Sequence, residues 1–91
     1  MSDWHTARGW TPRVIQAARR SWAPHVAQEP VCEMCGERIL KGQLWHVDHA
    51  VPLSEGGAVG RENQRPVHAA CNMRAAARMT HAMFARRRRW V

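Results

Sequence analysis

Three short segments decide the fold: CEMC at residues 32–35, VDHAVPLSEGG at residues 47–57 and ENQRPVHAACN at residues 62–72. The first segment carries two cysteines separated by two residues, and the third carries a histidine and a cysteine at the same spacing. This spacing lets both members of a pair approach one ion from a tight turn or from the first turn of a helix. The sequence therefore predicts a closed structural zinc site with four ligands: Cys32, Cys35, His68 and Cys71.

A metal site explains the cysteines better than a disulfide does, but one alternative stays open. Three cysteines cannot all pair within one chain, and Cys32 and Cys35 are too close in sequence for a disulfide to add much stability. In the alternative, these two form a redox or chance pair, and His68 and Cys71 are ordinary helix residues. Zinc would contribute folding free energy where a chain of 91 residues has little core.

The charge of the chain indicates a polyanionic partner. The 91 residues include 14 Lys plus Arg against 7 Asp plus Glu, which gives a net charge of +7, and Lys41 is the only lysine. Arginine binds phosphate oxygens bidentately, so this composition favours nucleic acid. A basic surface without such a function is the alternative. The length excludes a large enzyme with its own cofactor domain, because a chain this short forms one small domain.

No segment of the sequence suggests a membrane or a secretory route. The longest apolar stretches are only a few residues long, whereas a membrane-spanning helix needs roughly twenty apolar residues. The first ten residues, MSDWHTARGW, include an acidic residue and lack the apolar core of a signal peptide. We therefore expect no membrane partner and a cytoplasmic location, which would be the host cytoplasm if a phage encodes the protein.

Hydrophobic periodicity and turn residues predict an α+β fold. A helix begins at a threonine followed by a proline, and Pro24 is expected to end it. Its apolar stripe would cover the core, and Arg19 would face away from that stripe. The expected elements are a helix over about residues 12–22, a hairpin of strands at residues 39–40 and 43–47, and a helix over about residues 68–83.

Asp48 and His49 place a carboxylate and an imidazole side by side at the end of an expected strand. Hydrolysis of a phosphodiester needs a base that takes a proton from water and a cation that neutralises charge on the phosphate and the leaving oxygen. Histidine suits the first role, and hard oxygen ligands such as Asp48 and the amide of Asn72 suit Mg²⁺ for the second. Taken alone, the Asp-His pair could equally be a surface dipeptide.

Taken together and in this order, the three segments resemble the HNH endonuclease family, whose members are ββα-metal nucleases. VDHAVPLSEGG is similar to the signature loop of that family almost residue for residue. The resemblance implies a small zinc-stabilised ββα-metal (His-Me finger) domain with an extra N-terminal helix, a common companion in small bacteriophage and prophage members. The chain would then have four parts: a loose N-terminal arm (1–10), the N-terminal helix and linker (11–31), the HNH nuclease domain with structural zinc (32–85) and a basic C-terminal tail (86–91).

The resemblance also implies roles for individual residues. His49 would be the general base that activates water. Asp48 and Asn72 would hold a catalytic Mg²⁺ or Mn²⁺ ion, and Asn63 would brace the loop and orient the base. Asn72 stands where many relatives have histidine, so the chain is an HNN variant, and Ala76 stands where some relatives place a further histidine ligand.

Cations around this centre would bind DNA. Four arginines flank the loop and the last helix: Arg61, Arg65, Arg74 and Arg78. The last two are four residues apart on one helix face and are expected to follow a phosphate strand. His46 shares a strand face with Asp48 by alternation, and two roles stay open for it. It either approaches the scissile phosphate or the metal, or it is a half-exposed strand histidine.

The sequence thus predicts a metal-dependent HNH endonuclease that hydrolyses DNA phosphodiester bonds and, as the family does, leaves 5′-phosphate and 3′-hydroxyl ends. A monomer or weak dimer would nick one strand, and double-strand cleavage would need a dimer or two events. The phage-type resemblance implies a terminase large subunit as partner in genome packaging. One alternative is a non-catalytic zinc-knuckle protein that binds DNA or assists packaging, and another is a toxin that cleaves RNA or any nucleic acid.

Overall fold

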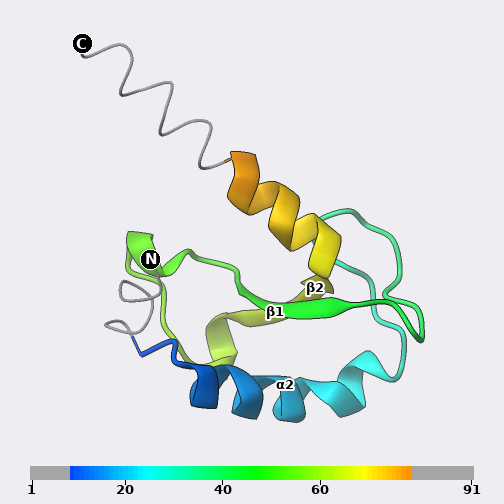
Figure 1. Ribbon diagram of the computed structural model, residues 1–91, viewed down its shortest axis with the longest axis horizontal. Helices are drawn as coiled ribbons and strands as arrows, with labels where there is room; N and C mark the ends of the chain where they lie inside the picture. The colour runs from blue at the N-terminus through cyan, green and yellow to red at the C-terminus, as the bar shows by residue number, and fades with distance from the viewer. Residues whose placement is uncertain (1–8, 79–91) are drawn as a thin grey trace.

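The computed structural model describes residues 9–78 and has a small α+β fold (Figure 1). Within these residues, a two-stranded antiparallel sheet lies between two helices. The elements in chain order are α2 (Pro12–Val26), β1 (Trp45–His49), β2 (Gln64–His68) and a helix over residues 69–78, here termed the C-terminal helix. The last three form the predicted ββα unit, and α2 is the predicted additional helix. The predicted basic tail and the end of the last predicted helix lie outside the described residues.

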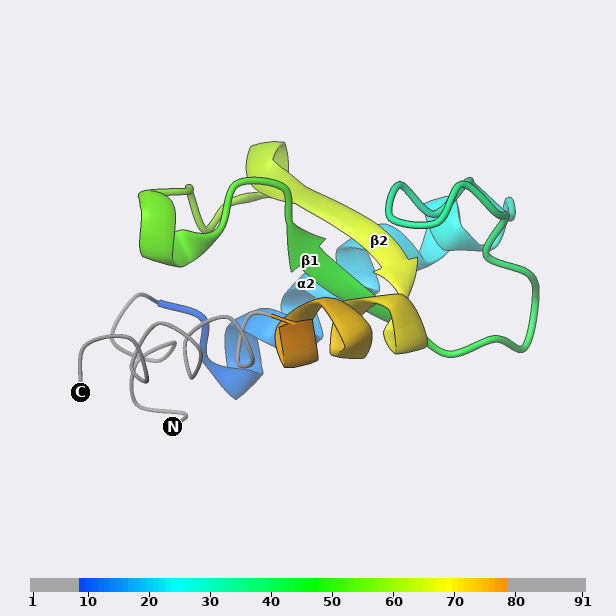
Figure 2. The ribbon, with the colours of Figure 1, turned by 90° about the horizontal axis from the view of Figure 1, so that it is seen from above.

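The register of the sheet sets which side chains meet. Asp48 lies opposite Arg65, and His49 lies opposite Gln64. Because successive side chains of a strand point to opposite faces, His46 and Asp48 share one face of β1. Figure 2 shows the C-terminal helix crossing the sheet on the side away from α2.

The predicted hairpin between residues 39–40 and 43–47 is wrong. The partner of β1 is β2, which follows the long loop, and residues 39–44 form no strand. Ile39 is instead fully buried, and its backbone N–H donates to the carbonyl of Pro30. This bond, together with an isolated bridge between Val31 and Arg38, turns the chain back on itself before β1 begins.

Helix α2 starts as predicted but ends later. The hydroxyl of Thr11 accepts a hydrogen bond from the backbone N–H of Val14, and Pro12 occupies the first turn, where its missing N–H costs nothing. The predicted stop at Pro24 is wrong, because the helix continues to Val26. A proline in the last turn removes only one backbone bond, and packing of Val26 against the core offsets that loss.

Docking of α2 on the sheet corrects a second expectation. Arg19, expected to face solvent, is half-buried, and its guanidinium lies 4.3 Å from the centroid of the Trp45 ring. The same guanidinium donates to the Trp45 carbonyl. Ala18 is buried beside it, and so small a side chain allows the helix to approach β1 closely. Arg19 therefore fastens α2 to β1 and is not part of a free basic face.

The hydrophobic core is built around the predicted zinc ligands. Its buried members are Cys32, Ile39, Val67 and Cys71, and the half-buried residues packed on them are Val26, Met34 and Trp45. Two of these four buried side chains are therefore cysteines. Such a core is too small to hold the domain together by apolar burial alone, so a metal bound by these thiols would contribute a large part of the folding free energy.

Neither helix in the described part of the chain is long and apolar enough to cross a membrane.

Candidate metal centre and active site

The four predicted zinc ligands meet in one cluster. The ligand atoms of Cys32, Cys35, His68 and Cys71 all lie within 4.8 Å of one another. The first two come from a tight turn, in which the N–H of Gly36 donates to the Cys32 carbonyl at 2.8 Å and the N–H of Cys32 donates to the Glu37 carbonyl at 2.7 Å. Gly36 adopts a positive φ of 81° there, which favours glycine. The turn thus directs both thiols to one point.

The imidazole of His68 is oriented for metal binding. Its Nε2 lies 3.1 Å from the Arg38 carbonyl and 3.0 Å from Oε1 of Gln43, so an Nε2–H donates to these acceptors. Nδ1 then carries the lone pair, and it lies 3.4 Å from Sγ of Cys35 and 3.8 Å from Sγ of Cys71. Outer hydrogen bonds of this kind fix the tautomer of a metal-ligating histidine. The cluster therefore fits a structural zinc ion in both its donor set and its geometry.

The environment of the thiols separates their ionisation. Burial raises the pKa of the Cys32 thiol, but hydrogen bonds from the backbone N–H groups of His68, Cys35 and Met34 outweigh this effect and lower the pKa to about 6. Burial raises the pKa of the Cys71 thiol, and the nearby Cys35 and Cys32 raise it further. Several thiolates this close together need a cation, which zinc would supply.

His49 stands at the end of β1 with its ring held from two directions. Its Nε2 lies 3.2 Å from the Val59 carbonyl, so an Nε2–H donates to that oxygen and leaves Nδ1 as the basic nitrogen. The ring of Trp10 packs against it edge to face, with the ring centroids 4.3 Å apart and the planes at 76°. The geometry thus gives His49 a single defined orientation and a lone pair on Nδ1.

Asn63 braces the loop between the strands from inside. Its side chain is buried and makes three hydrogen bonds of 2.8 Å. Nδ2 donates to the carbonyls of Val51 and Ala58, and Oδ1 accepts from the N–H of Val51. Gly57 leaves room for this side chain, because a Cβ there would lie 2.8 Å from Asn63 Nδ2 and 2.0 Å from the Val51 carbonyl oxygen. Asn63 therefore fixes the loop that carries the Val59 carbonyl.

Asp48 and Asn72 are each held by a neighbouring side chain. Nε and Nη2 of Arg65 both lie 3.1 Å from Oδ2 of Asp48. Within residues 9–78, Oδ1 of Asp48 accepts no side-chain hydrogen bond, so it is available to a cation. Nδ2 of Asn72 lies 3.0 Å from Nδ1 of His46 and donates to it, which turns the amide oxygen away from His46. The described structure contains no hydrogen bond that joins Asp48 to Asn72 or to His49.

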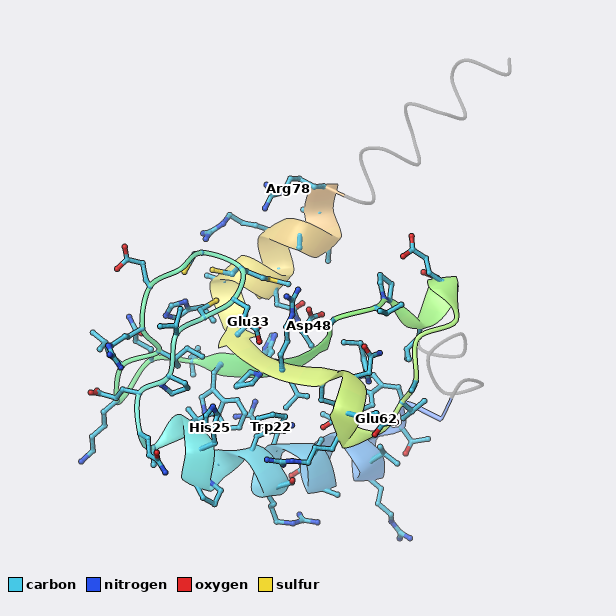
Figure 3. The ribbon with its side chains drawn as sticks, turned by 180° about the vertical axis from the view of Figure 1, so that it is seen from behind. Trp22, His25, Glu33, Asp48, Glu62 and Arg78 are labelled. Carbon is cyan, nitrogen blue, oxygen red and sulfur yellow. The ribbon has the colours of Figure 1, made fainter. Side chains whose placement is uncertain are left out.

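The four arginines expected to bind DNA lie in different settings. Arg65 is paired with Asp48, and Arg74 lies beside the metal cluster, with its Nη2 3.4 Å from Sγ of Cys71. The guanidinium of Arg61 lies 3.9 Å from the centroid of the Trp22 ring. Arg78 is exposed at the end of the described part of the C-terminal helix (Figure 3). Three of the four therefore have partners inside the protein.

Sequence reasoning missed four groups that hold His49, either directly or through a neighbour. The Val59 carbonyl leaves no trace in the sequence, because any residue has a carbonyl. Gln64 Nε2 donates to that same oxygen at 2.9 Å, and Trp22 Nε1 donates to Gln64 Oε1, also at 2.9 Å. The sequence predicts only a helix with an apolar stripe around Trp22 and a loose arm around Trp10. Gln64 could be found only from its position opposite His49 in the sheet, and that position follows only once β1 is known to pair with β2.

Fold and site together define a small ββα domain with a Cys₃His cluster that fits zinc and an Asp-His pair at the end of its first strand. A sequence model of the HNH endonuclease family matches residues 32–78, which is just over half of the chain. The chain belongs to the HNH endonuclease family. A search among curated proteins found no match. The matched region contains all four predicted zinc ligands and ends at the last described residue of the C-terminal helix.

Proposed function

We propose that this protein is a metal-dependent endonuclease that hydrolyses DNA phosphodiester bonds with His49 as the general base. The observation that supports this function best is the Nε2 bond of His49 to the Val59 carbonyl, within a chain of the HNH endonuclease family. A general base needs a free lone pair in a fixed direction, and this bond leaves one on Nδ1. Its orientation depends on the loop that Asn63 braces.

In the proposed reaction, Nδ1 of His49 takes a proton from water as the water oxygen forms a bond to phosphorus. The bond between phosphorus and the 3′ oxygen breaks, and that oxygen takes a proton from solvent. The products carry a 5′-phosphate and a 3′-hydroxyl. His49 returns its proton to solvent before the next cycle.

The residues expected to hold the catalytic ion have suitable chemistry. Asp48 offers a carboxylate oxygen and Asn72 an amide oxygen, and such hard oxygen ligands fit Mg²⁺ or Mn²⁺. A divalent ion at this position would neutralise charge on the phosphate and on the leaving oxygen. Arg65 keeps the Asp48 carboxylate in place by gripping Oδ2, and His46 does the same for the Asn72 amide.

Binding of DNA would rest on the net charge of +7 and on arginines around the site. Arg74 and Arg78 are both exposed on the C-terminal helix, and Arg74 also contacts Cys71 of the metal cluster. We assign nuclease function to residues 32–85 and phosphate contact to the basic tail at residues 86–91. The family resemblance also suggests a terminase large subunit as partner. Co-purification of such a subunit with the protein tests this interaction.

A supercoiled-plasmid assay in EDTA, Mg²⁺ or Mn²⁺ tests the function. Wild-type protein should convert plasmid to open circles only with a divalent ion, and His49→Ala and Asp48→Asn should not. Glu37→Gln, which neutralises an exposed acid in the cysteine turn, is the charge-matched control for Asp48→Asn and should cut normally. Linear product would indicate paired active sites. Binding of plasmid without cutting under all conditions would contradict the proposal and favour a DNA-binding accessory protein.

A further inference from the structure

Residues 9–31 precede the family match, and Trp10 in this segment contacts the ring of His49. We propose that this segment belongs to the catalytic centre, in which Trp10 and Trp22 are positioning residues for His49. The family match begins at residue 32, so membership of the family does not specify these contacts. This role rests on the proposed function, since it matters for cleavage only if His49 is the base.

Trp10 limits the movement of the His49 ring. One hydrogen bond from Nε2 leaves the imidazole free to swing about its outer side-chain torsion, which has broad minima. The edge-to-face contact with Trp10, at 4.3 Å between centroids, fills the space into which the ring would turn. The preceding residue, Gly9, packs against the loop that contains Val59, because a Cβ at Gly9 would lie 3.8 Å from Cγ2 of Val59. The segment is thus seated on the loop that accepts the His49 bond.

Trp22 acts on the same acceptor from α2. Its indole N–H can only donate, so its 2.9 Å bond to Oε1 decides which way the Gln64 amide faces. The amide nitrogen of Gln64 then points to the Val59 carbonyl, also at 2.9 Å. That carbonyl therefore accepts from both Gln64 and His49. Through this chain of bonds, α2 holds the oxygen that fixes the tautomer of His49.

Arg61 strengthens the connection between loop and helix. Its guanidinium stacks on the Trp22 ring at 3.9 Å and donates to the hydroxyl of Ser21. The short helix η2 (Arg61–Asn63), which carries the brace residue Asn63, is thereby fastened to α2 beside the Trp22–Gln64 bond. Two tryptophans and one arginine thus couple a segment outside the family match to the loop around the proposed base.

Three conservative variants of the full zinc-bound chain separate positioning from folding. Trp10→Leu keeps apolar volume but removes the aromatic edge, Trp10→Phe keeps an aromatic edge, and Trp22→Phe keeps the ring but removes the indole N–H. Leu44→Ala, at a side chain that is 80% exposed, is the control. We expect kcat for plasmid nicking to fall about tenfold in Trp10→Leu and about threefold in Trp22→Phe, with KM unchanged. Trp10→Phe should restore most of the rate.

Nitrogen NMR of the His49 ring provides a readout that does not need activity. Wild-type protein should show a single tautomer with the proton on Nε2, and Trp10→Leu should show a mixture. A kcat for Trp10→Leu within about twofold of wild type, while His49→Ala is inactive, would overturn the inference and leave the proposed function intact. If wild-type protein cuts no DNA, the proposed function fails and the spectra alone decide. An unchanged tautomer in Trp10→Leu would then overturn the positioning role, and a mixture would support it.

Discussion

Arg65 lies directly opposite Asp48 in the antiparallel sheet, and two nitrogens of its guanidinium contact the same carboxylate oxygen, each at 3.1 Å. The pairing follows from the register, since residues opposite each other in antiparallel strands have neighbouring side chains. Among residues 9–78, no side chain donates to the other oxygen of Asp48, which would be open to a cation. One arginine thus holds the proposed metal ligand and would place positive charge near a bound ion.

Replacement of Arg65 should therefore have two opposite effects. In Arg65→Gln, loss of the nearby positive charge should tighten Mn²⁺ binding about two- to fivefold, a modest change because both side chains are partly exposed. Loss of the grip on Asp48 should lower kcat at saturating metal. Manganese titration followed by electron paramagnetic resonance measures the first effect. Arg20→Gln on the exposed face of α2 is the matched control, and weaker Mn²⁺ binding in Arg65→Gln would contradict the expected sign.

Cys35→Ser should remove both zinc and the folded state. Two of the four buried core side chains, Cys32 and Cys71, also belong to the predicted metal cluster, and structural zinc contributes on the order of 10 kcal/mol in small zinc domains. Metal analysis should find one zinc per wild-type chain and none in the variant, whose near-ultraviolet circular dichroism should collapse. Glu33→Gln, an exposed change in the same turn, should retain zinc. A folded wild-type protein without zinc would disprove the ligand assignment.

Gly57→Ala should displace the braced loop. A Cβ at this position would lie 2.0 Å from the Val51 carbonyl oxygen, so the backbone must move. We expect a loss of about 1–3 kcal/mol in the free energy of unfolding, together with a marked loss of cleavage, because the loop also carries the acceptor for His49. Gly56→Ala meets no atom within 4 Å and strains only its positive φ of 85°, so it should be stable enough to cut DNA. Denaturant unfolding and plasmid nicking compare the two, and equal activity would argue against the brace.

His46→Leu should weaken binding of the catalytic ion indirectly, through the orientation of Asn72. The variant removes the acceptor that holds Nδ2 of Asn72, and loss of such outer partners costs about tenfold or more in metal affinity. The Mn²⁺ concentration for half-maximal nicking should rise accordingly, with little change in the rate at saturating Mn²⁺. His46→Gln retains an acceptor oxygen and should recover part of the affinity. The same Mn²⁺ requirement in wild type and His46→Leu would show that His46 does not orient Asn72.

Arg74 and Arg78 should differ in their contributions to DNA binding. Both arginines are exposed, but Arg74 also contacts the cysteine cluster, so Arg78→Ala should reduce the slope of log affinity against log salt by about one. Arg74 lies 3.4 Å from Sγ of Cys71, so Arg74→Ala should change the slope less and instead speed the loss of zinc to a chelator. Fluorescence anisotropy at several salt concentrations gives the slopes. An unchanged slope in a variant that combines Arg74→Ala with Arg78→Ala would show that the C-terminal helix does not contact DNA.

The sequence by itself determined the local features of this protein. The spacing of Cys32 and Cys35 specifies a turn that directs two thiols to one point, and the Thr11–Pro12 pair specifies a helix start. Each depends on residues a few positions apart, so their chemistry acts without the rest of the fold. The two Cys/His pairs of the zinc cluster and the helix start were predicted for this reason, whereas the ββα order was predicted from the family resemblance. The roles of Asp48, His49 and Asn72 remain predictions from family resemblance.

Tertiary structure decided the features that depend on distant partners. β1 pairs with β2 and not with residues 39–40 as in the expected hairpin. Ile39 is instead buried in the core, and its backbone N–H donates to the carbonyl of Pro30, so this segment belongs to the cysteine turn. Only that pairing sets Arg65 against Asp48 and Gln64 beside His49. The contact of Trp10 with His49 likewise joins residues 39 positions apart, and no local pattern encodes such a contact. Local chemistry thus determined the metal turn, whereas long-range packing determined how the site around His49 is held.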